Sequence, residues 1–452
     1  MAFTNFYVQT TGSDKNAGST TDNAAVYTTL AGNWSTATNK FTPTDGSTPA
    51  NSVAVNDYVS IMATGATVTI FTAKVTAVAA GVNGDITVSS TLKWGTAPST
   101  NSGSRELRAG GAFATEQPPS TQGWGGTTIG ESTKINIKAA TYTFGGVRTF
   151  SMAGTATLTL WYSGYQTTPG DLDATRTNTL TRVTFALGAS NTMTMSGALQ
   201  TWSGIIVTGS RNGVLIATSA TQFYASRCQW INTGTGTLAS LNATSANGKY
   251  AYCYFSVPTT ATAADMMPGG ASNLVYVGCV FEGGGRVQVA TTTFSVMFLE
   301  CCFINGTGAL TSTTGSLRCY DCTFSVFTGN AIAWSGTPGG GSIVGACLFR
   351  SITGTAIFNN SGTNTRLVEL VCNDFYNNGT NETGFGDTPD FFVQTDSSDP
   401  VVSASDLTPI PSSNAWAAGF PGLYENETFG RYVHIGGATP VPGGSSGGIF
   451  GG

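Results

Sequence analysis

The sequence predicts an all-β protein whose main body is a parallel β-helix, a solenoid of short strands stacked rung upon rung. Three observations predict it. A short cysteine–any residue–aromatic motif recurs, its spacing is nearly constant, and strand-like segments and turn residues flank each copy. Self-similarity with a fixed period of about 20–50 residues is the sequence signature of repeat architectures.

The motif occurs seven times, the last time in the looser form Cys372-Asn-Asp-Phe375, and its cysteines are 25, 26, 22, 21, 25 and 25 residues apart. Residues i and i+2 of a strand point to the same face. Each cysteine and its aromatic residue should therefore share the interior face, where stacked rungs align them into ladders. The predicted ladder residues are Cys228, Cys253, Cys279, Cys301, Cys322, Cys347, Cys372, Trp230, Phe255, Phe281, Phe303, Phe324 and Phe349.

Each motif is followed by a polar turn and a second short strand, as in Phe303–Leu310, and is preceded by an apolar strand such as Leu274–Val277. The turns contain Asn or Gly, which tolerate the left-handed backbone that a sharp corner needs. Three strands per repeat make one rung, and rungs stack at about 4.8 Å.

The chain divides into three parts. Residues 1–130 form an N-terminal cap with the first rungs and an antiparallel β-hairpin insert at about 66–104, because an alternating stretch, Thr67–Val78, leads into the turn Gly81–Gly84. Residues 131–380 form the β-helix, most regular at 228–375. Residues 381–452 form an irregular C-terminal cap with a Gly/Ser-rich tail, since a last rung without a cap exposes an apolar face and a free edge.

Composition narrows the range of functions that the chain could have. Charged residues make up 10% of the chain, against about 25% in ordinary domains. The net charge is −5 with no basic run, which argues against nucleic-acid binding. We expect no membrane span, because no run of about 18 apolar residues occurs. The first residues lack the pattern of a signal peptide, so we expect synthesis and folding in a host cytoplasm.

All nine cysteines fall within the repeat, and we expect buried free thiols that behave as small apolar side chains. Cys302 and Cys319 have the opposite parity to the motif cysteines, so we expect them to face outward and to react first with a thiol reagent. Cys319 and Cys322 have metal-ligand spacing, but no second pair accompanies them and they should lie on opposite strand faces. We therefore expect no metal and no cofactor.

Several stretches resemble a known family. The strand and loop ending in Gly12–Gly18 resemble the opening of many right-handed parallel β-helix proteins; Asp14 there should close a turn, with a calcium ligand as the alternative. The segment Asn56–Met62 resembles the next inward strand of that family, and a similar phrase returns at Lys134–Thr143.

Ser163–Asp171 with its Thr-rich continuation resembles β-helix proteins of tailed bacteriophages, which share a pectate-lyase-like solenoid, and Ala415–Pro421 resembles their closing cap. The resemblance implies a right-handed parallel β-helix. It also implies one of two roles: a virion surface component, or a tailspike that binds or cuts polysaccharide.

Candidate catalytic residues are few. The only histidine, His434, lies in the expected C-terminal cap. Glycoside hydrolysis needs two carboxyl groups about 5 Å apart in retaining enzymes and about 6.5–9.5 Å apart in inverting ones. Glu300 and Asp321 each stand directly before a motif cysteine, so they should face outward one rung apart. The alternative interpretation is two solvated acids whose charges Arg318 or Arg350 relieves.

The middle of the chain offers two further candidate sets. One is a charge cluster, interpreted as a loop salt-bridge network or as a saccharide or cation site: Asp171, Asp173, Arg176 and Arg182. The other is a set of tryptophans that could contact sugar but that we expect mostly in the core: Trp124, Trp161 and Trp202.

The sequence favours a non-enzymatic structural component of a tailed-phage virion, either a capsid-exterior decoration or cement-type protein or a tail-attached fibre. The alternative is a tailspike that binds or depolymerises host surface polysaccharide as a hydrolase or lyase. A surface this poor in charge lacks the groups that keep molecules apart. We therefore expect partners among other virion proteins and among copies of the chain itself, most simply as a homotrimer in the virion.

Overall fold

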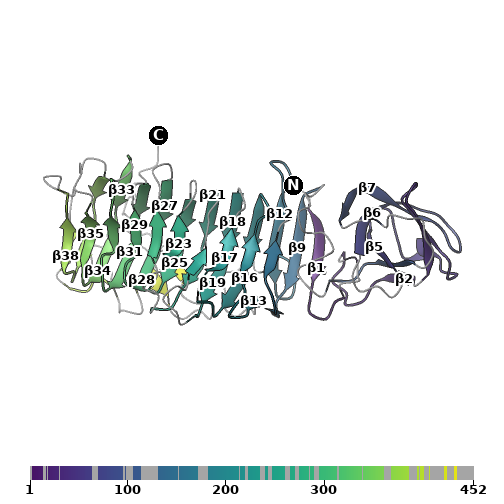
Figure 1. Cartoon of the computed structure of the whole chain (residues 1–452), viewed down its shortest axis with the longest axis horizontal. Helices are drawn as coiled ribbons and strands as arrows, with labels where there is room; N and C mark the ends of the chain where they lie inside the picture. Colours follow the sequence, from purple (N-terminus) through teal and green to yellow (C-terminus); the bar gives the residue numbers. More distant parts are fainter. Residues whose placement is uncertain are drawn as a thin grey trace, which may run out of the picture. The chain divides into compact units, whose positions relative to one another are not determined.

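The computed structural model describes these residues: 3–13, 17, 19–29, 31–63, 70–94, 97, 105–113, 131–150, 152–171, 182–212, 214–218, 222–234, 240–242, 247–259, 265–269, 274–284, 286–289, 295–312, 315–337, 340–360, 368–385, 394–396, 398–401, 407, 422–424 and 432–434. It divides into an N-terminal unit, Met1–Lys249, and a C-terminal unit, Tyr250–Gly452. Figure 1 labels the strands of both units.

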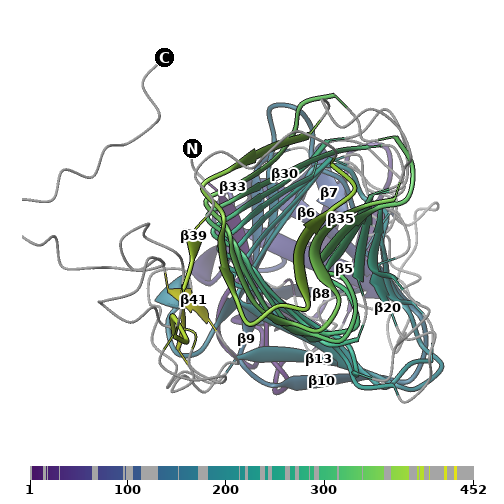
Figure 2. The ribbon, with the colours of Figure 1, turned by 90° about the vertical axis from the view of Figure 1, so that its left-hand side faces the viewer.

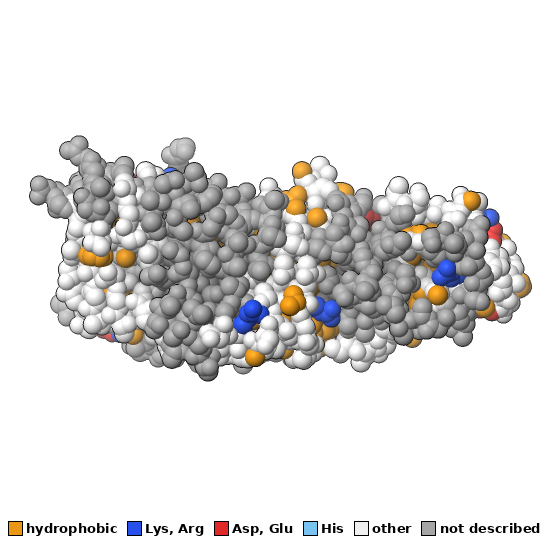
Figure 3. All heavy atoms as spheres, viewed as in Figure 1, with side chains coloured by type: hydrophobic (Ala, Val, Ile, Leu, Met, Phe, Trp, Pro, Cys, Tyr) orange, Lys and Arg blue, Asp and Glu red, His pale blue; other side chains and the backbone are white. Residues whose placement is uncertain are grey.

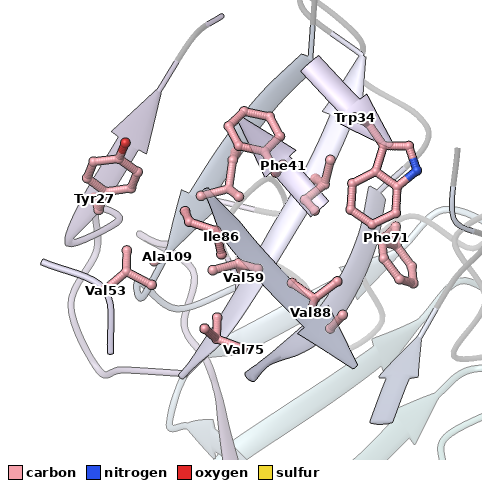
Figure 4. Close-up of a cluster of buried hydrophobic side chains, with 13 residues drawn as sticks. Tyr27, Trp34, Phe41, Val53, Val59, Phe71, Val75, Ile86, Val88 and Ala109 are labelled. Carbon is pink, nitrogen blue, oxygen red and sulfur yellow. The ribbon is translucent and has the colours of Figure 1, made fainter. Parts of the chain in front are cut away.

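An antiparallel sheet forms one end of the N-terminal unit. Its strands, in spatial order, are β2 (Tyr27–Thr29), β8 (Arg105–Ala109), β5 (Tyr58–Ala63), β6 (Ile70–Val78), β7 (Ile86–Trp94), β4 (Lys40–Pro43) and β3 (Gly32–Ser35), with a short 3-10 helix at Pro49–Asn51. The expected hairpin is present as the antiparallel pair β6–β7. Inward side chains, among them Trp34, Phe41 and Phe71, close a core of their own (Figure 4).

One part of the family resemblance is wrong in detail. Asn56–Met62 resembles an inward strand of a β-helix in sequence, but β5 pairs antiparallel with β6 and β8. The comparable phrase at Lys134–Thr143 does lie in a rung, because β9 (Thr133–Lys138) pairs parallel with β1 (Thr4–Val8). The antiparallel module is therefore inserted between the first two strands of the first parallel sheet.

The rest of the N-terminal unit stacks three parallel sheets. The first sheet contains β1, β9, β12 (Leu160–Tyr165), β15 (Gln200–Ser203) and β18 (Gln222–Ser226). The second sheet contains β10 (Thr141–Phe144), β13 (Val183–Leu187), β16 (Ile205–Gly209) and β19 (Gln229–Asn232). The third sheet contains β11 (Arg148–Phe150), β14 (Met193–Met195), β17 (Val214–Thr218) and β20 (Ser240–Asn242). Bulky rings fill the interior, and Trp202 lies 4.8 Å from Phe150 and 4.9 Å from Tyr162 between ring centroids.

The C-terminal unit repeats this plan; β21 (Asn247–Ala251) contains the boundary. Its first sheet contains β24 (Leu274–Val277), β27 (Ser295–Leu299), β30 (Ser316–Tyr320), β33 (Ser342–Gly345) and β36 (Val368–Val371). Its second sheet contains β22 (Tyr254–Ser256), β25 (Val280–Glu282), β28 (Cys302–Gly306), β31 (Thr323–Phe327), β34 (Leu348–Ile352), β37 (Asp374–Tyr376) and β39 (Gln394–Thr395). Its third sheet contains β23 (Asp265–Gly269), β26 (Arg286–Val289), β29 (Leu310–Ser312), β32 (Ile332–Trp334), β35 (Thr355–Asn359) and β38 (Thr380–Thr383). A separate hairpin joins β40 (Gly422–Tyr424) and β41 (Tyr432–His434). Figure 2 shows the rungs of this unit overlying one another.

The motif aromatics of the C-terminal unit form one buried column. Adjacent ring centroids from Phe255 to Phe349 are 4.7–4.8 Å apart, and Phe375 continues the column 5.3 Å beyond Phe349. The rings are nearly parallel, with interplanar angles of 3–15°. The spacing equals the distance between neighbouring strands, so the backbone repeat itself sets the ring stack.

A left-handed residue precedes each motif cysteine except the last, Cys372, and makes the bend between the first and second sheets. In the C-terminal unit these residues, all with φ between 51° and 58°, are Tyr252, Gly278, Glu300, Asp321 and Ala346. The cysteine after the bend caps it: the Cys301 thiol lies 3.3 Å from the Leu299 carbonyl and 3.5 Å from the Tyr276 carbonyl of the rung below. A small, weak donor thus satisfies carbonyl groups at a crowded corner.

The expectation that Cys319 faces outward is wrong, and so is the expectation that it and Cys322 lie on opposite faces. Cys319 is fully buried, in register with the inward residues Phe298 and Val344. The alternation of strand faces holds only while the backbone stays extended. The left-handed residue Asp321 interrupts it, so both thiols point inward.

The expectation of a reactive, exposed Cys302 is also wrong, for another reason. Cys302 does lie on the outer face of the second sheet, yet it is 0% exposed. Val401 and Leu407 of the C-terminal segment pack over it in one apolar cluster with Ile304 and Leu348. The C-terminal segment therefore also covers part of the outer face of the second sheet.

The last motif is shifted by one residue. Cys372 is the left-handed residue of its rung, with φ 56°, and it is only partly buried. Asn373 takes the ladder position: its side-chain oxygen accepts from the Cys347 amide at 3.1 Å, and its amide donates to the Val344 carbonyl at 2.9 Å. A buried amide with two good partners replaces the thiol where the ladder ends.

The predicted fold class is confirmed: the chain is all-β, with a parallel β-solenoid and an antiparallel β-sheet at one end. The residues described have few charged side chains, and blue and red atoms are sparse among the coloured residues of Figure 3. Among the described residues, no helix is long and apolar enough to cross a membrane.

Candidate functional site

Glu300 and Asp321 occupy the same bend on consecutive rungs. Both have the left-handed backbone conformation, with φ of 54° and 53°. The Glu300 amide donates to the Tyr320 carbonyl at 3.0 Å, and the Asp321 amide donates to the Gly345 carbonyl at 3.2 Å. These rung-to-rung bonds hold the two backbones in register, so the carboxyl groups project from one corner of the solenoid.

Both carboxyl groups are half-buried, and their environment favours the neutral form. Burial raises the pKa of Glu300. Burial also raises the pKa of Asp321 to about 6, with a smaller contribution from the negative charge of Glu300. Neighbouring carboxyls with raised pKa values are a recurrent feature of sites that transfer protons, and also of acids crowded by folding alone.

The arginines expected to relieve these charges bond elsewhere. Arg350 donates through Nε to Asp399 at 2.7 Å and through Nη1 to Ser325 at 3.2 Å. Arg318 donates through Nε to the Gly341 carbonyl at 3.1 Å. The Glu300–Asp321 pair is thus positioned at one corner, and these two arginines are bonded to other groups.

We expect Asp321→Asn to stabilise the protein at neutral pH and to have no effect in acid. The pKa of Asp321 is higher in the folded state than in the unfolded state. The contribution of the Asp321 carboxyl group to folding stability is therefore fully present below about pH 4 and is lost as pH rises through about 6. The asparagine amide does not ionise, so the Tm of the variant should stay constant over the pH range in which the Tm of the wild type falls. Thermal melts at pH 4 and 7 measure this, with the exposed Glu369→Gln as control; equal Tm shifts at both pH values would contradict it.

The charge cluster of the middle chain resolves into separate structural roles. Asp171 accepts hydrogen bonds from the backbone amides of Gln166, Thr167 and Thr168 at 2.7–3.2 Å, which closes a turn. Arg182 is 4% exposed and donates to the Arg227 carbonyl at 3.0 Å. The other two members lie outside the described residues: Asp173 and Arg176.

The tryptophans divide in the same way. Trp202 is fully buried, whereas Trp161 is partly exposed on the outer face of the first sheet, with the Lys134 ammonium 3.9 Å from its ring centroid.

His434 ends β41. Asp14 and Trp124 lie outside the described residues. Within the described part of the chain, no three His, Cys, Asp or Glu side chains are placed to hold a metal ion.

A polar hollow of about 460 Å³ lies beside β1, lined by Thr4 and Asn5 and by residues of the antiparallel module. Its ionisable lining residues have partners: Tyr58 donates to Glu131, the Lys74 ammonium lies 3.5 Å from the same carboxylate, and Asp57 accepts from the Ala54 amide at 2.8 Å. Such mutual satisfaction is typical of a structural network.

An outer apolar face is the feature that reasoning from the sequence missed. On the first sheet of the C-terminal unit, strand register aligns two outward rows across successive rungs. We call this surface the apolar strip; its partly exposed apolar members are Val275, Val277, Met297, Leu299, Ile343 and Val371. The available signal was the near-continuous apolar character of Leu274–Val277 and Val296–Leu299, where a solvated face would alternate with polar residues.

No protein-family model matches the chain, and no curated protein matches it. Among solved structures, an alginate lyase, AlyGC of family PL6, is 10% identical with a TM-score of 0.28; the match covers 59% of this chain and 51% of the lyase. The catalytic domain of a GH87 α-1,3-glucanase is 10% identical with a TM-score of 0.15, over 84% of this chain and 90% of that domain. This chain spans about half the length of the alginate lyase. The fold assignment rests on strand pairing, and these weak likenesses add nothing to it.

Proposed function

We propose that the chain is a non-enzymatic structural component of a tailed-phage virion, located on the capsid exterior or in a tail-attached fibre, and that it assembles through the apolar strip. The strip is the observation that supports this role. It carries six partly exposed aliphatic or thioether side chains on four of five successive rungs. The middle rung contributes Arg318 and Tyr320, and Glu369 of the last rung is the second charged member. Partly exposed apolar side chains gathered on one face of a protein are typical of an interaction surface.

The interior supports the same role. Stacked rings and thiols fill the solenoid of the C-terminal unit, and the C-terminal segment covers part of the second sheet's outer face. A rigid, repetitive body with one apolar face suits packing against copies of itself, most simply as a homotrimer, or against other virion proteins.

Oligomeric state tests the proposal. We expect the wild-type chain to form a trimer by mass photometry and to co-purify with phage particles. The double variant Val277→Glu/Val371→Glu should be monomeric, because unpaired charges on the strip oppose its burial. Thr328→Glu, on an exposed turn, is the matched control and should assemble normally. A monodisperse wild-type monomer at high concentration, with no affinity for particles, would overturn the proposal.

A second candidate function is supported by the Glu300–Asp321 pair: binding or cleavage of host surface polysaccharide, as in a tailspike. A carboxyl whose pKa is raised to about 6, beside a second carboxyl, has the composition of a glycosidase acid–base pair. The test is release of reducing ends or unsaturated uronates from host polysaccharide. Loss of release in both Glu300→Gln and Asp321→Asn supports cleavage by this pair, whereas release that survives both substitutions, or no release by the wild type, rejects it. Binding without cleavage is tested by co-sedimentation of the wild type with the same polysaccharide, and no co-sedimentation rejects it.

A further inference from the structure

The C-terminal segment returns over the solenoid after its last paired strand. β39 pairs parallel with β37 at the edge of the second sheet. The chain then reaches back across earlier rungs, where Asp399 pairs with Arg350 and Val401 and Leu407 join the apolar cluster. We call the described residues of this stretch the return segment: Asp396, Ser398–Val401 and Leu407.

Two acids lie where the return segment begins. Asp374 of β37 is 0% exposed, and neither of its carboxyl oxygens has a hydrogen-bond partner among the described groups; one oxygen of Asp396 is also buried without one. The strand register places them side by side: Asp374 lies opposite Gln394 in the β37–β39 pair, and the Asp396 amide donates to the Phe375 carbonyl at 3.2 Å. Two carboxylates cannot donate to each other. A proton on the Asp374 carboxyl would supply the missing donor.

We propose that Asp374 and Asp396 form a proton-operated latch that holds the return segment on the outer face of the second sheet. When Asp374 loses its proton, its repulsion with Asp396 loosens the segment and uncovers Cys302, Ile304 and Leu348. The latch concerns the second sheet, and so it does not depend on the proposed role of the apolar strip.

The other charged groups nearby have fixed roles. The guanidinium of Arg350, from β34, is held by Asp399 and Ser325. Hydrogen bonds and the positive charge of Arg350 keep the pKa of Asp399 below its usual range despite partial burial, so this ion pair is unchanged between pH 5 and 8. On β37 itself the remaining titratable side chain is Tyr376, and on β34 the neighbour of Asp374 is the apolar Leu348.

The sign of the pH dependence follows from linkage. Burial, together with the adjacent Asp396, raises the pKa of Asp374 to about 7, from an ordinary value of 3.8 that applies once the segment has left. A proton is therefore bound more tightly in the docked state. The docking equilibrium is strongest below about pH 4, weakens about tenfold per pH unit above that, and levels off near pH 7.

Reaction of Cys302 measures the undocked state, because the return segment covers this thiol while the ladder thiols stay in the interior. The full-length chain is treated with a dithiodipyridine reagent at pH 5, 6, 7 and 8, and modified sites are identified by mass spectrometry. Asp374→Asn is the matched control, because its amide donates to Asp396 without ionising. The ratio of the wild-type to the variant rate at each pH cancels the reagent's own pH dependence.

We expect this ratio to rise up to about a hundredfold from pH 5 to 7 and then to level off. Asp399→Asn, which breaks the Arg350 pair, should label rapidly at every pH and so verify that Cys302 reports undocking. A ratio that stays flat or falls with pH overturns the latch. Protection restored at pH 7 by calcium in the wild type alone also overturns it, because a cation rather than a proton would then join the two acids.

Discussion

Replacing Phe303 with Ala should destabilise the C-terminal unit by about 3–5 kcal/mol, the usual cost of emptying a well-packed aromatic site. Phe303 is 1% exposed, and its ring stacks between Phe281 at 4.8 Å and Phe324 at 4.7 Å. A third ring, Phe298, meets it edge-on at 5.2 Å. Neighbouring rungs are tied by their own backbone bonds, so the site cannot collapse to fill the space, and the cavity remains.

Urea unfolding measures the effect, provided that the denaturant slope is unchanged by the substitution. The matched control is Met297→Ala, a large-to-small change on the partly exposed outer face of the same unit, for which we expect about 1 kcal/mol. Similar losses for the two variants would mean that the ring column contributes no more than surface packing does.

The ladder was predictable because it depends on a local rule repeated many times. A one-in-two periodicity and a constant spacing placed Phe255 through Phe349 in one column without knowledge of the loops between them. The same rule failed at Cys319, where a single left-handed residue resets the alternation of faces. Non-glycine residues such as Glu300 and Asp321 occupy that bend, so the sequence carries no clear sign of it.

The site residues were harder to predict for a different reason. The register placed Glu300 and Asp321 one rung apart, but their burial and their raised pKa values depend on packing that periodicity does not describe. Cys302 shows the limit most directly. Its parity correctly indicates the outer face, yet its accessibility is decided by Val401 and Leu407, about a hundred residues later in the chain. Long-range packing of an irregular segment has no local sequence signal.

Gly283→Ala should be about as damaging as the loss of a core ring, although it adds a single methyl group. Gly283 has φ +120°, a backbone conformation that residues with a side chain rarely adopt, and an added Cβ would overlap the Val257 carbonyl oxygen. Since this oxygen belongs to the backbone of the rung below, it cannot rotate away. Backbone strain and overpacking together should cost about 3 kcal/mol or more.

The same substitution at Gly341 separates these two causes. Gly341 lies in the same unit with φ +76°, but an added Cβ would meet only the tip of the flexible Arg318 side chain, at 3.2 Å. Gly341→Ala should therefore cost about 1–2 kcal/mol, the usual strain of a left-handed residue with a side chain. Urea unfolding of the two variants measures the difference. If Gly283→Ala costs no more than Gly341→Ala, then the rungs can separate locally, and close rung-to-rung contact is not what requires glycine there.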